Sequence, residues 1–153
     1  MTKLLIVCMG NICRSPMAHA VFAKKISNAG LSAQISVDSA GTHAARGGER
    51  PDPRADSSLS RRGYAVGRIR SRRIEVEDFQ IFDLILAMDS ENLADLRKSC
   101  PQEFLAKIRL FLDFEEQSGG ENVPDPYYGN AQGFERVLDL CEAGVDGWID
   151  RLR

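Results

Sequence analysis

The sequence is poor in histidine and has no long hydrophobic segment. Its only two histidines are His19 and His43, and its four cysteines are scattered. Because zinc sites in proteins group several His and Cys ligands, we expect no metal, and we expect no other cofactor. No run approaches the roughly 20 apolar residues that a membrane-spanning helix needs. The apolar run after Lys3 is too short for a signal peptide. We therefore expect no membrane association, and cysteines in such a chain fit a reducing cytoplasm.

A strong excess of charge of one sign is also lacking. The net charge of −2 argues against nucleic-acid binding. Arginine is dense over residues 61–73, and we interpret this run as a solvated surface rather than a device that steers substrate. The 153 residues show no internal repeat, low-complexity tract or linker. This length suits one compact domain, so we expect a single domain over residues 1–153 and a monomer.

Four short apolar runs, at residues 4–7, 35–37, 84–88 and 108–112, are typical of buried strands. Helical spacing of apolar residues falls between and after them, over residues 17–29, 57–62, 90–96 and 134–152. This alternation predicts an α/β domain with a doubly wound, four-stranded parallel sheet and helices on both faces. Ligands of such sheets bind beyond the carboxyl ends of the strands.

Residues 4–16, with the sequence LLIVCMGNICRSP, are the most informative segment. An apolar strand ends on Cys8, a tight loop follows, and Ser15 and Pro16 are typical of a helix cap and first helical position. Free backbone N–H groups and the helix dipole favour an anion in such a loop. The same field, together with Arg14, favours the thiolate of Cys8, which is the reactive form of a cysteine.

The spacing of this segment predicts a cradle for one tetrahedral oxyanion. Five residues separate Cys8 from Arg14. Gly10 permits positive φ and close backbone approach, and Asn11 tolerates the left-handed region. The Arg14 guanidinium matches two phosphoryl oxygens. No Gly-Lys-Ser/Thr ending is present, so this is not a Walker loop. A nucleophile in such a cradle predicts phosphoryl transfer through a covalent cysteine intermediate.

These residues resemble a known signature. The pattern Val7-Cys8-x-Gly10-Asn11-x-Cys13-Arg14-Ser15-Pro16 is similar to that of the low-molecular-weight protein tyrosine phosphatases. The resemblance continues, in the family's order, in four further blocks: DSAGT at residues 38–42, PDPRA at 51–55, FDLILAMD at 82–89 and DPYYG at 125–129.

The resemblance implies hydrolysis of phosphotyrosine in proteins, with a phosphoprotein as substrate and a tyrosine kinase as a possible partner. It implies that Cys8 is the nucleophile, that Arg14 binds phosphate and that Asp125 is the general acid and base. The local sequence around Asp125, between two prolines, by itself favours a turn-forming residue, and it is the resemblance that favours the general acid. The implied phosphate-binding loop comprises Met9, Gly10, Asn11, Ile12, Cys13 and Ser15.

The remaining parts of the implied site are less specific. Tyr127 and Tyr128 are expected to line the cleft, although loop packing would explain them equally well. Ser39 is expected to reach toward Asn11, and Ser15 offers its hydroxyl to Cys8. Cys13, five positions from Cys8, is a candidate redox partner if the loop bends.

Two departures from the family pattern concern preference and rate. The family commonly carries a bulky aromatic residue near the position of Ala45, so we expect a more open cleft. Many members also have a histidine near the position of Ile69, so the hydrogen bonding around Asn11 must be arranged differently here.

Three alternatives remain open. An arsenate reductase shares this loop and fold but by resemblance uses a further cysteine pair, which Cys100 and Cys141 do not form in sequence. An arginine phosphatase carries a small Thr where Ile12 stands, and Ile12 favours a flat phenyl ring instead. The third alternative is a non-enzymatic anion-binding or redox module.

Overall fold

The computed structural model describes residues 1–113 and 122–153. Its sheet has four parallel strands in the order β2-β1-β3-β4, with helices between them in the chain, as the sequence predicts. The strands are β1 (Thr2–Cys8), β2 (Ile35–Gly41), β3 (Leu84–Ala87) and β4 (Ile108–Leu110). The helices are α1 (Arg14–Asn28), α2 (Pro53–Arg61), α3 (Asp78–Ile81), α4 (Ser90–Ser99) and α5 (Ala131–Leu152), with a 3₁₀ helix η1 at Gln102–Lys107.

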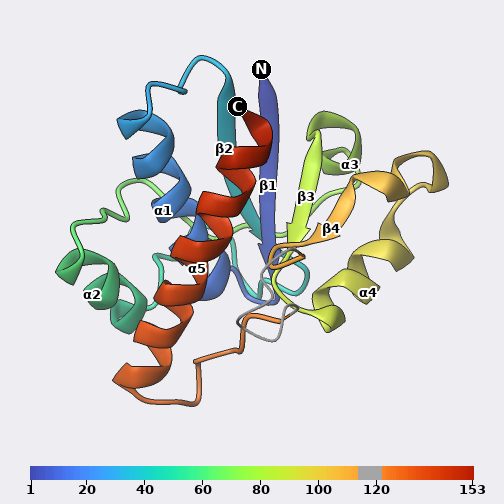
Figure 1. The fold of residues 1–153 in the computed structure, drawn as a ribbon. Helices are drawn as coiled ribbons and strands as arrows, with labels where there is room; N and C mark the ends of the chain where they lie inside the picture. The colour runs from blue at the N-terminus through green and yellow to red at the C-terminus, as the bar shows by residue number, and fades with distance from the viewer. Residues whose placement is uncertain (114–121) are drawn as a thin grey trace.

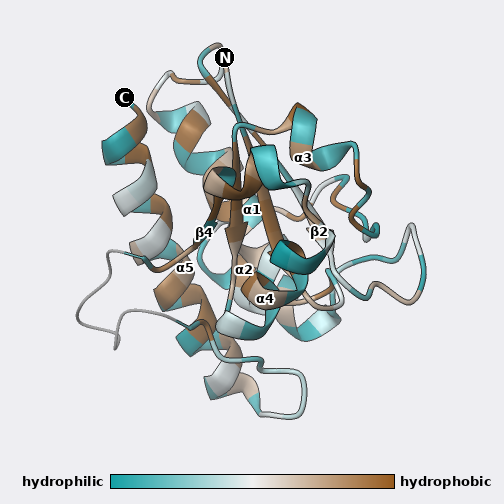
Figure 2. Ribbon diagram, turned by 90° about the vertical axis from the view of Figure 1, so that its right-hand side faces the viewer, coloured by the Kyte–Doolittle hydropathy of each residue, from teal (hydrophilic) through white to brown (hydrophobic). Residues whose placement is uncertain are grey.

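Helices cover both faces of the sheet, as predicted. Successive side chains of a strand point to opposite faces, and in β1 Leu4 and Ile6 pack with α1 and α5 in one core cluster. Leu5 and Val7 pack with residues from α3 and α4 in the other. In Figure 1, α5 runs across one side of the sheet and α3 and α4 lie beyond β3 and β4. Figure 2 shows the hydrophobic strands in the interior and hydrophilic colours on much of the outer helices.

The start of α1 differs from the prediction. The helix begins at Arg14 with Cys13 as its N-cap, so Ser15 and Pro16 lie in its first turn rather than at the cap and first position. The Ser15 hydroxyl is used by Cys8 and Asn11 instead of by a backbone N–H of the helix. The early start places Arg14 on the first turn of a regular helix, where its backbone is fixed.

Capping side chains set the starts of three other helices. Asp52, Asp89 and Asn130 accept hydrogen bonds from the backbone N–H groups of Arg54, Asn92 and Gly133, respectively. Helix α2 starts four residues earlier than predicted because Asp52 and the proline after it form a strong start signal.

Strand boundaries and short elements also differ from the sequence pattern. Strand β2 continues beyond the apolar run to Gly41, which pairs with Cys8 of β1, so that the two strands end together. Strands β3 and β4 are shorter than their apolar runs. Helix α3 and η1 were not predicted, since each is too short to show a helical period.

The arginine-rich run is only partly the solvated surface that we predicted. Arg62 binds three carboxylates of α5, those of Glu135, Asp139 and Glu142. Arg72 binds Asp38 and Asp78. None of the helices in the described part of the chain is long and apolar enough to cross a membrane.

Candidate active site

The loop after β1 encloses the Cys8 sulfur. Cys8 is buried, with 3% of its surface exposed. Its Sγ lies 3.0 Å from the Ser15 Oγ and 3.3 Å from the Asn11 backbone nitrogen, which donates to it. Two donors at a buried sulfur stabilise a thiolate, because they replace the water that the sulfur has lost.

Asn11 organises the loop from within. Its backbone has φ of 57°, the only positive φ of a non-glycine residue in the described chain. Its side-chain Nδ2 donates to the Ser15 Oγ at 2.8 Å, and its Oδ1 accepts the Arg72 backbone N–H at 2.9 Å. The Ser15 oxygen accepts from Asn11, so its single hydroxyl proton goes either to the Cys8 sulfur at 3.0 Å or to the Ala40 carbonyl oxygen at 3.5 Å. The shorter contact favours the sulfur.

The prediction for Gly10 was wrong. Gly10 does not have a positive φ, and a Cβ at this position would come no closer than 3.7 Å to another residue, the Ile12 side chain. The turn is therefore made by Asn11 alone. The glycine that the loop needs is Gly41, at the end of β2. A Cβ there would lie 2.6 Å from the Met9 carbonyl oxygen, so the loop rests directly on the backbone of β2.

The loop presents unused donors to its interior. The backbone N–H groups of Met9, Gly10, Ile12 and Cys13 have no acceptor among the described residues. They precede the first turn of α1, whose positive dipole end adds to their field. A ring of N–H groups around a nucleophile is an oxyanion site, and it suits a tetrahedral phosphoryl group.

Arg14 is held at the edge of this ring by a carboxylate that was not predicted to belong to the site. Its Nη1 donates to Asp89 Oδ2 at 2.5 Å and to the Val123 carbonyl at 3.0 Å. Burial alone would lower the pKa of Arg14, but the negative charges of Cys8 and Asp89 outweigh burial and raise it. Arg14 therefore stays charged, and these contacts orient its guanidinium.

Asp125 and the two tyrosines close the site from the segment before α5. Asp125 Oδ1 accepts the Tyr127 backbone N–H at 3.0 Å, and Oδ2 lies 3.8 Å from Arg14 Nη2. The rings of Tyr127 and Tyr128 meet edge to face at 4.9 Å. A cavity of about 270 Å³ lies between them and the loop. Its lining comprises Cys8, Met9, Gly10, Ile12, Cys13, Arg14, Asp125, Tyr127 and Tyr128.

Cys13 is a buried, neutral thiol next to the cavity. Burial, followed by the negative charge of Asp52, raises the pKa of Cys13 to about 12. Asp52 is in turn held by Arg54, which binds both of its carboxylate oxygens. Cys8 and Cys13 are both reduced in this structure. The two cysteines of one loop thus have opposite environments.

Ser39 does not have the predicted partner. It is buried at the end of β2, but its Oγ is paired with His19 Nδ1 at 2.9 Å rather than with Asn11. Burial lowers the pKa of His19 although Asp38 opposes it, so His19 is held neutral. The Asn11 side-chain oxygen instead accepts a hydrogen bond from the Arg72 backbone N–H. In this chain, which lacks the histidine expected near Ile69, a backbone group therefore holds Asn11.

Ala45 does not line the cavity. Among the described residues, the cavity lining comes only from the loop after β1 and from residues 125–128, and Ala45 is exposed. Cys100 and Cys141 cannot act as a pair, because Cys100 packs on the α3 and α4 face of the sheet and Cys141 on the α1 and α5 face. Within residues 1–113 and 122–153, no group of three or more potential metal ligands is found.

The structure therefore brings together all the predicted site residues except Ser39, whose hydroxyl is paired with His19 of α1. It adds four that were missed: His19, Asp52, Arg72 and Asp89. Asp89 lies 75 positions from Arg14 in the sequence, and Arg72 contributes a backbone group, so no local pattern could have assigned either. Asp52 belongs to a block that resembles the family, but nothing in the sequence indicated that it would lie beside Cys13.

A parallel sheet that ends in a buried cysteine, a ring of N–H groups and an arginine defines a class, that of cysteine-dependent phosphatases. Comparison with known proteins is more specific. The family model described as low molecular weight phosphotyrosine protein phosphatase matches residues 3–153. The chain belongs to this family, whose members are hydrolases.

Individual relatives cover nearly the whole chain. A low molecular weight protein-tyrosine-phosphatase of Streptomyces coelicolor is 40% identical, over 99% of this chain and 93% of the relative. A low molecular weight phosphotyrosine protein phosphatase of Homo sapiens is 42% identical, over 91% and 88%. The crystal structure of a protein tyrosine phosphatase from Entamoeba histolytica, with Hepes in the active site, superposes with a TM-score of 0.94 at 43% identity, over 99% and 97%.

Proposed function

We propose that this protein hydrolyses phosphotyrosine in proteins, and aryl phosphates generally, through a phosphocysteine intermediate on Cys8. The observation that carries the proposal is the Cys8 sulfur, which receives donors from Ser15 and Asn11 at the floor of a cavity that Arg14 and Asp125 also line. Family membership supports the same reaction.

In the first step, the Cys8 thiolate attacks phosphorus and the bond to the phenolic oxygen breaks. The free N–H groups of the loop and the Arg14 guanidinium stabilise the charge on the equatorial oxygens. Asp125 in its acid form donates a proton to the departing phenolate. Asp125 Oδ2 lies 3.8 Å from Arg14 Nη2 and is the oxygen that would face a phosphoryl group held by Arg14.

In the second step, water attacks the phosphocysteine and Asp125 accepts its proton. Inorganic phosphate leaves and the Cys8 thiolate is restored, with Ser15 as its donor. A thiolate stabilised by hydrogen bonds is a better leaving group than a free one, so the Ser15 contact serves this step as well.

The cavity supports an aryl substrate over a phosphoarginine. Ile12, Tyr127 and Tyr128 give it an apolar wall, and a phosphate on a phenyl ring reaches Cys8 while its peptide stays outside. Phosphoserine would bring its backbone against Tyr127 and Met9. An arsenate reductase is disfavoured because Cys100 and Cys141 lie on opposite faces of the sheet.

A panel of substrates tests the proposal. The purified protein should hydrolyse p-nitrophenyl phosphate in the presence of a metal chelator and should cleave phosphotyrosine peptides much faster than phosphoserine or phosphoarginine peptides. Cys8→Ser should abolish turnover while still binding inorganic phosphate, and Arg14→Lys should impair both. Residual turnover by Cys8→Ser would refute the nucleophile, and faster cleavage of phosphoarginine would refute the substrate.

Asp125→Ala tests the proton donor. Lost acid catalysis typically costs about 10²–10⁴-fold, and the loss should shrink as the leaving group becomes more acidic, because a good leaving group needs no proton. Asp125→Asn keeps the size and the acceptor for the Tyr127 N–H and serves as the matched variant. A loss that does not depend on the leaving group would mean that Asp125 only shapes the loop.

Three further expectations complete the proposal. We propose a cytoplasmic location, supported by four free cysteines, a monomer, and a phosphoprotein substrate made by a tyrosine kinase. Gel filtration and cell fractionation test the first two.

A further inference from the structure

The loop over residues 42–51 is fastened to the phosphate cradle at both of its ends. At one end, the His43 backbone N–H donates to the Met9 carbonyl at 2.8 Å. At the other, the Asp52 backbone N–H donates to the Ile12 carbonyl at 2.7 Å. Met9 and Ile12 both line the cavity. Both ends of the loop are therefore fixed to the backbone of residues that line the cavity, which places the loop next to it.

A second segment, residues 68–73, braces the middle of this loop through one buried serine. The Gly48 N–H donates to the Ser71 carbonyl at 2.7 Å, and the Ser71 N–H donates to the Glu49 carbonyl at 2.8 Å. The Ser71 hydroxyl donates to the Arg46 carbonyl at 2.7 Å and accepts from the Glu49 N–H at 3.0 Å. Four hydrogen bonds on a residue that is 3% exposed hold the two segments together.

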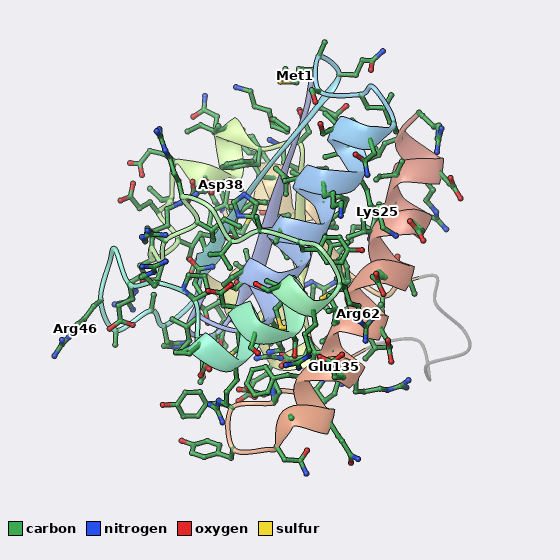
Figure 3. All side chains as sticks on the ribbon, turned by 90° about the vertical axis from the view of Figure 1, so that its left-hand side faces the viewer. Met1, Lys25, Asp38, Arg46, Arg62 and Glu135 are labelled. Atoms are coloured by element: carbon green, nitrogen blue, oxygen red, sulfur yellow. The ribbon has the colours of Figure 1, made fainter. Side chains whose placement is uncertain are left out.

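These two segments carry five exposed arginines, which we name the basic rim: Arg46, Arg50, Arg68, Arg70 and Arg73. No carboxylate among the described residues forms an ion pair with any of them, and the Arg70 guanidinium donates only to backbone carbonyls. Figure 3 shows Arg46 pointing away from the body of the molecule.

Neighbouring arginines differ in this respect. Arg72 is bound by Asp38 and Asp78, and Arg54 by Asp52. In Figure 3, Arg62 lies beside Glu135, with which it forms an ion pair. The arginines of the basic rim thus differ from these neighbours in forming no ion pair among the described residues, although Asp38 lines one hollow with Arg68 and Arg70.

The charge of the basic rim is local. Glu49 is the only acid within residues 43–50 and 68–73, and the nearby Asp95 faces His43 at 3.9 Å. The chain as a whole has a net charge of −2, so this positive surface does not reflect an overall basic composition. A rigid positive surface at the border of a site attracts and orients anionic partners.

We propose that the basic rim binds acidic residues that flank the phosphotyrosine, and that the protein therefore prefers substrates in acidic segments. This inference rests on the proposed function. A peptide that leaves the cavity over Met9, which is half exposed, meets the loop over residues 42–51 and then the arginines of its brace. The guanidinium groups pair with Asp or Glu side chains, while the cavity holds the phosphotyrosine ring.

Matched peptides test this proposal. Two phosphotyrosine peptides of the same length, one with Asp and Glu flanks and one with Asn and Gln at the same positions, would be compared by kcat/KM. Several exposed pairs together are expected to favour the acidic peptide about 10-fold at low ionic strength, and the preference should fall toward unity in high salt.

Charge-reversal variants locate the effect. The double variant Arg46→Glu/Arg50→Glu should abolish or invert the ratio between the two peptides. Lys3→Glu is the control, since Lys3 is exposed at the other end of β1 from Cys8 and carries the same kind of charge change. It should leave the ratio as in the parent protein.

The outcomes are distinct. Equal kcat/KM for the two peptides in the parent protein would overturn the proposed role of the basic rim. A loss of preference in Lys3→Glu as large as that in Arg46→Glu/Arg50→Glu would overturn it as well. Turnover of p-nitrophenyl phosphate, which has no flanking residues, is measured alongside. If the parent protein lacks that activity as well, it is the proposed function that fails rather than the rim alone.

Discussion

Gly41→Ala is expected to damage the active site although Gly41 belongs to β2 and not to the loop around Cys8. The added Cβ would stand 2.6 Å from the Met9 carbonyl oxygen and 3.1 Å from the Asn11 backbone nitrogen. Ordinary contacts of a Cβ begin at 3.4 Å, so the Met9 carbonyl must retreat by about 0.8 Å. Because the obstructing atoms are backbone, no side-chain rotation relieves the contact.

The size of the effect follows from this displacement. A misplacement of about 1 Å in the groups that position a reacting centre costs on the order of 10²-fold. We therefore expect kcat/KM for p-nitrophenyl phosphate to fall about 30- to 100-fold in Gly41→Ala, with weaker inhibition by inorganic phosphate. Overpacking should also lower the free energy of unfolding by about 1–3 kcal/mol, which urea denaturation measures.

Two other glycines separate distortion of the cradle from loss of stability. Gly47→Ala places a Cβ 3.9 Å from the nearest atom, the Ser71 carbonyl oxygen, and should change neither activity nor stability. Gly144→Ala overlaps the Phe111 ring at 2.4 Å, away from the cradle, and should lower stability while the folded fraction keeps its activity. Activity of Gly41→Ala within about threefold of the parent, or a loss no larger than that of Gly144→Ala, would contradict the predicted distortion of the cradle.

Three further expectations follow from the surroundings of single residues. Since the pKa of Cys13 is raised to about 12, iodoacetamide at about pH 8 should alkylate Cys8 well before Cys13, and equal alkylation of both thiols would contradict this expectation. Peroxide should yield a Cys8–Cys13 disulfide that dithiothreitol reverses. Burial lowers the pKa of His19 below 6.5, so near this pH the unfolded chain binds more protons than the folded one. Stability should therefore decrease as pH falls through 6.5. His19→Gln should flatten the change in Tm between about pH 7.5 and 5.5, and an unchanged slope would show that another group is responsible. Asp89→Asn keeps an oxygen for the helix cap but loses the carboxylate that holds Arg14, so kcat/KM should fall with little change in Tm. A fall in Tm that accompanies the fall in kcat/KM would indicate a purely structural role.

The sequence by itself determined the architecture and the catalytic core. Buried strands of a parallel sheet are continuous apolar runs and helices repeat at 3.6 residues, so both leave a local record in the chain. The cysteine, arginine and loop between them lie within seven residues of one another, and their spacing alone implies an oxyanion cradle. Resemblance to the family then linked Asp125 to the same site.

Only the tertiary structure decided what supports that core. Of the two uses that the sequence offered for Ser15, a helix cap and a hydroxyl for Cys8, the structure has the second, and of Gly10 and Asn11 only Asn11 has the positive φ. Gly41 at the end of β2 and Asp89 just after β3 reach the cradle because both strands are neighbours of β1 in the sheet, although they are distant from it in the sequence. Contacts of this kind depend on strand order and register, which bring residues together without any periodic pattern in the chain.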